Sequence, residues 1–103
     1  MNNLFDAIPE SLPHELIETI LSGEHVRIER IISHGHTSAE GFWYEQDEHE
    51  FVLLLEGEAE IEFIDHTLRL NAGDYLMIEA GKRHRVKWTT KDRATIWLAI
   101  FYS

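Results

Sequence analysis

Residues 50–57, EFVLLLEG, and residues 73–84, GDYLMIEAGKRH, decide how this sequence folds. Each segment has the apolar run expected of a β-strand and carries a glycine that predicts a tight turn. Each also carries one side chain that can hold a metal ion or exchange a proton, Glu50 in the first and His84 in the second. Because small β-barrels place such groups inside a pocket, the pair predicts a functional site within a barrel.

Strand-like alternation continues on both sides of these segments. In residues 58–63 glutamates alternate with alanine, isoleucine and phenylalanine, which predicts one wet face and one dry face. In residues 83–88 basic side chains alternate with His84, a valine and Trp88, so we expect His84 and Trp88 inside and the basic residues outside. Turn signals recur about every 8–12 residues, a spacing typical of a sandwich or barrel.

The N-terminal part is expected to differ from the rest. Pro13 suits the first turn of a helix, and Gly23 supplies a stop. Four apolar residues between them fall at helical spacing and predict a helix over about residues 14–22; they are Leu16, Ile17, Ile20 and Leu21. Because 103 residues suffice for one core only, we predict a single domain, with an N-terminal extension (1–25) and a barrel (26–103).

The composition limits the partners and the compartment. The formal net charge of −10 argues against nucleic acid, because phosphate backbones require a basic surface. The chain has no cysteine, which excludes disulfides and thiolate metal sites and fits a reducing cytosol. No apolar run approaches the ~18 residues of a membrane span, and the first residues lack a signal-peptide pattern. We therefore expect a cytoplasmic protein that binds neither nucleic acid nor membrane.

Charge is spread unevenly along the chain. Residues 40–62 are strongly acidic, whereas basic residues gather in residues 82–93. The plain interpretation is that the two sets form ion pairs between solvated faces of adjacent strands. The alternative is a basic rim that attracts an anionic ligand, and the sequence leaves both open.

The two opening segments resemble the two motifs of the cupin superfamily. Glu50, six further residues and Gly57 look like the end of the first motif. Gly73, five residues, then residues 79–81, two residues and His84 look like the second. The resemblance implies an all-β fold, a double-stranded β-helix (the jelly-roll or cupin barrel), which here would follow the short N-terminal helix.

The details of the resemblance point to a small single-domain cupin. The fifteen residues between the two motifs match the short spacer of compact bacterial cupins, and the resemblance covers residues 28–102. Two positions depart from the usual second motif, Glu79 where proline is usual and Trp88 where asparagine is usual. The resemblance is informative about fold rather than activity, because cupins include enzymes, storage proteins and regulators.

The resemblance also implies a metal site. Cupins usually take two histidines from a His-x-His pair, then the glutamate, then the histidine of the second motif; Glu50 and His84 match the last two. Tyr44 and Gln46 stand at the two histidine positions. A glutamine amide oxygen is a weaker ligand than imidazole, and tyrosine must first lose its proton. We expect a divalent ion (iron, manganese, nickel or zinc) on Gln46, Glu50 and His84, with His36 as a further ligand.

A second histidine pair offers another register. His34, Gly35, His36 and then Glu40 also satisfy His-x-His-x3-Glu, but Asp47 stands where the motif needs its glycine. In a hybrid arrangement, His36 or His34 joins the glutamate and histidine of the two motifs. Two imidazoles and one carboxylate suit non-haem iron(II) with open positions for substrate and oxygen.

Three functions remain open, and the sequence does not decide whether the chain is an enzyme. The first is a metal-binding cupin with oxygenase or hydrolytic activity. The second resembles the sugar epimerase branch of the cupins, with no metal; its catalytic residues would be His84 as base and Tyr44 as acid, with Glu50 beside them. The third is a non-catalytic module that binds or senses a small molecule in the barrel pocket.

An apolar outer face predicts a partner subunit. We expect five residues on that face, and such patches usually mark interfaces; they are Phe51, Leu53, Leu55, Trp97 and Phe101. Cupins commonly pair about a twofold axis, so we predict a homodimer.

Overall fold

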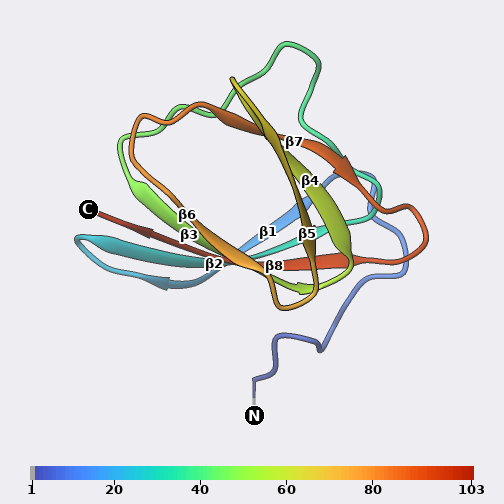
Figure 1. The fold of residues 1–103 in the computed structure, drawn as a ribbon. Coiled ribbons are helices and arrows are strands. Elements are labelled where there is room, and N and C mark those ends of the chain that lie inside the picture. The colour runs from blue at the N-terminus through green and yellow to red at the C-terminus, as the bar shows by residue number, and fades with distance from the viewer. Residues whose placement is uncertain (1) are drawn as a thin grey trace.

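The computed structural model describes residues 2–103 as eight β-strands, which Figure 1 shows around one interior. The strands are β1 (Leu16–Ser22), β2 (Val26–Ser33), β3 (His49–Glu56), β4 (Glu58–Phe63), β5 (Thr67–Asn71), β6 (Tyr75–Ile78), β7 (His84–Thr89) and β8 (Thr95–Tyr102). Within residues 2–103 no helix is long and apolar enough to cross a membrane.

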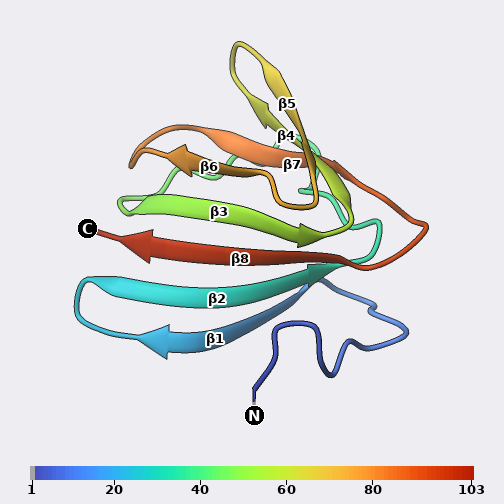
Figure 2. The same ribbon diagram turned by 60° about the horizontal axis from the view of Figure 1, so that its bottom comes forward.

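The strands form two antiparallel sheets. The larger sheet has the order β1-β2-β8-β3-β6, and Figure 2 shows β1, β2, β8 and β3 running side by side. The smaller sheet has the order β5-β4-β7. Strands that are distant in sequence are therefore neighbours, as in a jelly roll, and the all-β prediction is confirmed.

The predicted N-terminal helix is wrong, because residues 16–22 form the edge strand β1. Leu16 pairs with Ile32 of β2, and a register shift between Thr19 and Leu21 inserts one extra residue. Such a bulge interrupts the two-residue alternation, which explains why the apolar residues fall at a spacing that imitates a helix. The β-branched Ile17 and Thr19 also favour an extended backbone.

The core lies between the two sheets and is built from alternate residues. On β3, Val52 and Leu54 point inward, and Glu50 shares their side of the strand. On β4 the inward residues are Ala59, Ile61 and Phe63, so the dry face predicted for this strand is confirmed. Ile78 of β6, Leu70 of β5 and Trp97 of β8 complete the main cluster.

A second bulge reverses the prediction for Trp88. Ile61 pairs with Val86, but Glu60 pairs with Trp88, so Lys87 is the extra residue. Val86 faces inward beside Ile61, whereas Trp88 joins Glu60 on the outer face. The Arg69 guanidinium carbon lies 4.8 Å from the Trp88 ring centroid on that outer face.

Trp97 and Phe101 were also placed on the wrong face. Their relative exposures are 3% and 6%, and they pair with Leu54 and Glu50 of β3, whose side chains point inward. Strand β8 is apolar on both faces, so its own sequence does not reveal which set of residues faces the core. The other three residues expected on the outer face of the larger sheet, Phe51, Leu53 and Leu55, do lie there and are half-buried.

The N-terminal segment covers part of this outer face, below β1 in Figure 2. Arg30 of β2 is 8% exposed and donates hydrogen bonds to the carbonyl oxygens of Leu4 and Asp6. It also forms an ion pair with Glu18 of β1. A buried guanidinium group needs a compensating charge and acceptors for its N–H groups. Because Leu4 and Asp6 supply two of these acceptors, their contacts with Arg30 hold the N-terminal segment against the sheet.

Candidate functional site

A cavity of about 310 Å³ lies between the two sheets. Its walls are mainly aliphatic and aromatic, with contributions from Ile17, Ile31, Val52, Ile61, Ile78, Val86, Trp97 and Phe101. Its polar lining consists of Glu15, Arg27, Glu29, Tyr44, Gln46, Glu50 and His84. A mainly apolar cavity with a few convergent polar groups is the usual form of a small-molecule site.

A larger depression of about 740 Å³ lies outside the barrel, beneath the N-terminal segment. Its charged residues include Glu18 and Arg30, which are paired with each other. Because these two charges compensate each other, we take the cavity between the sheets as the candidate site.

The centre of the cavity site is a buried pair, Glu50 and His84. Strand alternation turns Glu50 of β3 inward, and His84 begins β7 on the inner face of the smaller sheet. Glu50 Oε1 lies 3.3 Å from His84 Nε2, and the two residues are 8% and 6% exposed. The structure therefore brings together, inside the barrel, the two residues that the sequence motifs singled out.

His84 is held in a form that favours the imidazolium. Its Nδ1 lies 3.0 Å from the Lys82 carbonyl oxygen, which only accepts, so Nδ1 carries the proton. A neutral ring would then turn the Nε2 lone pair toward the Glu50 carboxylate. Burial lowers the pKa of His84. The hydrogen bonds to Glu50 and to the Lys82 carbonyl, together with the Glu50 charge, raise this pKa by more than burial lowers it, so the net pKa lies above its ordinary value.

Gln46 completes the polar coordination of the carboxylate. Its Nε2 donates to Glu50 Oε1 at 3.0 Å. The Gln46 carbonyl oxygen accepts from the Gly81 N–H at 2.8 Å, which ties the segment before β3 to the turn before β7. One Glu50 oxygen therefore receives both the amide and the imidazole, which compensates much of the cost of burying the charge.

Tyr44 lies directly over His84. The two residues exchange backbone hydrogen bonds of 2.7 and 3.1 Å, and their rings stack with centroids 5.5 Å apart. Burial raises the pKa of the Tyr44 phenol, and the nearby charges of Glu15 and Glu50 raise it further. The phenol therefore stays protonated and can donate a hydrogen bond, although it cannot readily bind a metal as phenolate.

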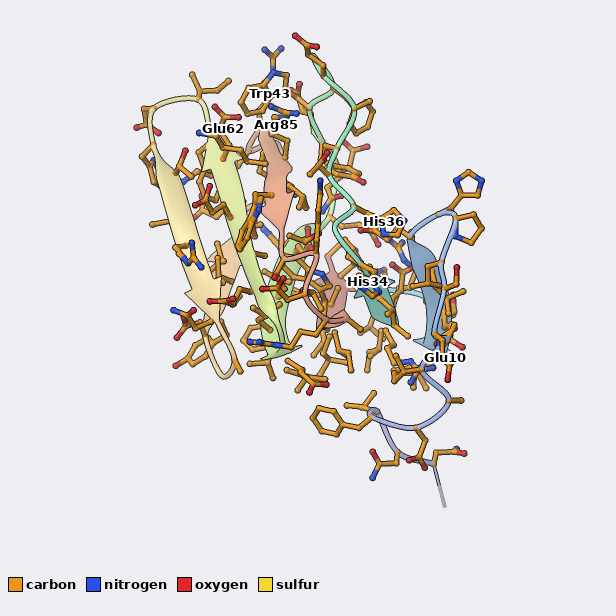
Figure 3. The ribbon with its side chains drawn as sticks, turned by 90° about the vertical axis from the view of Figure 1, so that its right-hand side faces the viewer. Glu10, His34, His36, Trp43, Glu62 and Arg85 are labelled. Atoms are coloured by element: carbon orange, nitrogen blue, oxygen red, sulfur yellow. The ribbon has the colours of Figure 1, made fainter. Side chains whose placement is uncertain are left out.

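The segment that carries Tyr44 is clamped by Arg85, a role that the sequence prediction missed. Its guanidinium donates to Glu62 Oε1 at 3.1 Å and to the Ser38 carbonyl oxygen at 3.2 Å. Its carbon lies 5.9 Å from the Trp43 ring centroid, and Figure 3 shows Trp43, Glu62 and Arg85 together. Alternation predicted a simple outward residue, because the contacts lie on a segment that alternation does not describe.

The spare histidines lie away from the buried pair. His34 Nε2 is 3.1 Å from the Lys91 carbonyl oxygen, and His36 Nδ1 accepts from the His34 N–H. His36 lines a separate, smaller depression beside the cavity, and neither histidine is among the residues that line the cavity itself. His49 Nδ1 accepts from the Ala80 N–H, on the opposite side of β3 from Glu50, as its register predicts.

As arranged in this structure, the donor set supplies only part of a transition-metal site. Within residues 2–103 no three His, Asp or Glu side chains are grouped so as to hold one ion. Glu50 and His84 supply two strong donors, but Gln46 points its amide nitrogen at the carboxylate and Tyr44 is protonated. Protein sites for these metals use three or four ligands. His84 Nε2 lies 3.3 Å from Glu50 Oε1, so the imidazole can place a positive charge beside this carboxylate when it is protonated.

Three charged residues at the cavity were not identified from the sequence. Glu15 accepts a 2.8 Å hydrogen bond from Ser33 Oγ, and Arg27 is paired with Glu29. Arg27 and Glu29 alternate with outward residues of β2, so the two-residue alternation of this strand could have predicted that both face the interior. Glu15 was assigned to a helix start, which concealed its position next to an edge strand.

Comparison with known proteins identifies the family. The family model for the cupin domain matches residues 29–101. A crystal structure named a putative mannose-6-phosphate isomerase, from Ralstonia eutropha, is 37% identical, with a TM-score of 0.96, and the match covers 100% of this chain and 97% of that one. A cupin superfamily protein from Desulfitobacterium hafniense is 25% identical, with a TM-score of 0.77, over 92% and 83% of the two chains. Comparison with curated proteins finds no match.

Proposed function

Because this chain belongs to the cupin family, we propose that it binds a small organic molecule in its barrel and transfers protons on it. The observation that carries the proposal is the buried contact between Glu50 and His84 at the cavity. Ionisable pairs of this kind, with a displaced pKa and access to a cavity, are frequent at catalytic sites. Tyr44 adds a hydrogen-bond donor next to the same imidazole.

The three residues have separate roles in the proposed reaction. In its neutral form His84 accepts a proton from a carbon next to a carbonyl group, and the electron pair of that C–H bond moves into an enolate. Tyr44 donates a hydrogen bond to the enolate oxygen, and Glu50 stabilises the imidazolium. The imidazolium then returns the proton to the same carbon. Where that carbon carries a hydroxyl group, the intermediate is an enediolate: the hydroxyl proton moves to the other oxygen, and the imidazolium delivers its proton to the former carbonyl carbon. The reaction needs no oxidant, because the same proton leaves and returns.

The Ralstonia relative supports this class of reaction. Its name is that of an isomerase, and interconversion of aldoses and ketoses moves protons next to a carbonyl group. The raised pKa of His84 makes its imidazole a stronger base than that of an ordinary histidine.

A metal-dependent function is the second candidate. Its ligands would be Gln46, Glu50 and His84, with iron, manganese, nickel or zinc as the ion and His36 as the further ligand predicted from the sequence. One contact favours it, since the Lys82 carbonyl fixes Nδ1 of His84 as second-shell groups do in metal sites. The Gln46 amide would have to turn its oxygen toward the ion.

Hydrogen exchange measured by NMR tests the proton-transfer proposal. Untagged protein in D₂O, incubated with a panel of small ketones and aldehydes, is expected to exchange C–H positions next to the carbonyl group. We expect Glu50→Gln, His84→Gln and Tyr44→Phe to slow this exchange by about 10²-fold or more. His36→Ala is the matched control and is expected to exchange normally. A panel without any exchange above buffer contradicts the proposal.

Elemental analysis of the same untagged protein separates the two candidates. Substoichiometric metal, with no thermal stabilisation by added divalent ions, supports the metal-free site. A stoichiometric ion that disappears in His84→Gln assigns the site to a metal, and its loss in His36→Ala would add His36 to the ligands.

We also propose that the outer face of the larger sheet joins two copies of the chain. Tyr75 and Met77 of β6 are 67% and 54% exposed there, beside the half-buried Phe51. Exposed apolar groups on one face favour association. Light scattering at micromolar concentration is expected to give twice the mass of the chain, and a monomer would contradict the proposal.

A further inference from the structure

We infer that the ligand of this cavity is a small organic cation, an amine with an apolar body, and that Glu15 binds its ammonium group. The inference rests on the proposed function only in that the cavity is the ligand site. It adds the class of ligand, and this class differs from the phosphorylated sugar in the name of the Ralstonia relative.

The charges that line the cavity favour a cation. Three carboxylates, those of Glu15, Glu29 and Glu50, face it together with two basic groups, Arg27 and His84. Glu50 is matched by His84, with 3.3 Å between Oε1 and Nε2. Arg27 is shared between Glu29 at 3.0 Å and Glu48 at 2.9 Å. Among the five charged groups that line the cavity, one negative charge is left over even when His84 is protonated, and a low-dielectric wall strengthens its field.

Glu15 is the carboxylate without a basic partner. In the described part of the chain it forms no ion pair, and Oε2 accepts its hydrogen bond from Ser33 Oγ at 2.8 Å. Ser33 is fully buried and itself accepts from Trp97 Nε1 at 3.3 Å. The relay from Trp97 through Ser33 orients Glu15, so that its remaining acceptor sites are available to a ligand.

The other walls suit an apolar body. Trp97 and Phe101 line the cavity, and Tyr44 stands beside Glu15 at its rim. Aromatic faces attract a cation through their quadrupole as well as binding hydrocarbon. A carboxylate next to aromatic walls is therefore complementary to an ammonium group attached to a short apolar chain or ring.

The same geometry disfavours a phosphorylated ligand. Arg27 is the only Lys or Arg side chain among the described residues that line the cavity. Its guanidinium group is already paired with the carboxylates of Glu29 and Glu48 and lies over the Phe101 ring. A phosphate would have to displace Glu29 or Glu48 and would still face Glu15. Specificity of this kind comes from the repulsion of the wrong charge as much as from attraction of the right one.

Three probes of similar shape test the inference: benzylamine, benzyl alcohol and benzoate. Binding is followed at low ionic strength by the NMR signal of the Trp97 indole N–H, which a Trp97→Phe sample assigns. We expect benzylamine to bind at least about fivefold more tightly than benzyl alcohol, and benzoate to bind most weakly. Glu15→Gln should abolish the advantage of the amine and leave the alcohol unchanged.

Glu10→Gln is the matched control, because it removes the same charge from an exposed position outside the cavity lining. Figure 3 shows Glu10 near the base of the N-terminal segment, well away from Arg85. It should keep the order of the three affinities. Equal binding of the three probes, or a preference for benzoate, overturns the inference and leaves the ligand site standing. If no probe shifts the Trp97 signal, both the inference and the proposed ligand site fail.

Discussion

The Gly57→Ala substitution tests how tightly the turn between β3 and β4 is built. Gly57 has φ of +94°, in the left-handed region that favours glycine. An added methyl group would also lie 2.6 Å from Thr95 Cα and 2.8 Å from Thr95 Cβ. The backbone strain costs about 1–2 kcal/mol, and overlap with a packed strand costs about 1–3 kcal/mol more. We expect a total loss of about 2–5 kcal/mol in the free energy of unfolding.

Gly73→Ala provides a control that separates the two terms. Gly73 has the same φ of +94°, but no atom lies within 4 Å of a methyl group built there. We therefore expect Gly73→Ala to cost the backbone strain alone, about 1–2 kcal/mol. Urea unfolding followed by circular dichroism measures both, and for a chain of this size each kcal/mol corresponds to about 4–8 °C in Tm. If the two variants lose equal stability, the argument from overlap with Thr95 is refuted.

Two further predictions concern the site. The raised pKa of His84 means that its pairing stabilises the fold fully below about pH 6.5, the ordinary value, and that this contribution is lost as pH rises through the raised value. Glu50→Gln removes the charge of Glu50 and weakens its hydrogen bond to His84, which both raise this pKa. NMR titration should therefore give a lower His84 pKa in the variant, and an unchanged pKa would contradict the pairing. In urea unfolding, the difference in stability between parent and variant should shrink toward alkaline pH. Arg85→Met should cost about 1–3 kcal/mol in urea unfolding, because half-buried polar partners lose a charged donor. Arg83→Met, which loses only an exposed ion pair with Glu45, should cost under about 0.5 kcal/mol, and equal losses would count against the clamp.

The sequence predicted those parts of the site that depend on strand alternation and on the spacing of the cupin motifs. His84 was placed inside by alternation at the start of β7, whereas Glu50 was singled out by its match to the first motif, because the run FVLLL that follows it is apolar at every position; the structure brings the two together. Tyr44 and Gln46 were placed beside them by their spacing from Glu50, and both contact the pair. The contribution of His36 as a metal ligand stays a prediction.

The errors have physical causes that a single sequence does not display. Bulges in β1 and β7 each insert one residue, which gave β1 the appearance of a helix and turned Trp88 outward. Strand β8 is apolar on both faces, so only its pairing with β3 shows that Trp97 and Phe101 are inside. The position of Glu15 at the cavity was not predicted, because the helix expected over residues 14–22 begins there and a residue at a helix end is not expected to face the interior of a barrel.

The residues that replace the usual histidines explain how Glu50 can remain buried as a carboxylate. A buried charge of this kind is costly unless a cation or several donors compensate it. Gln46 contributes an amide N–H to Glu50 Oε1, and His84 contributes its Nε2. When His84 is protonated, the pair is neutral overall. Tyr44 stacks on the imidazole and keeps its own proton, so the two departures from the cupin metal pattern place hydrogen-bond donors around the pair, as the proposed proton transfer requires.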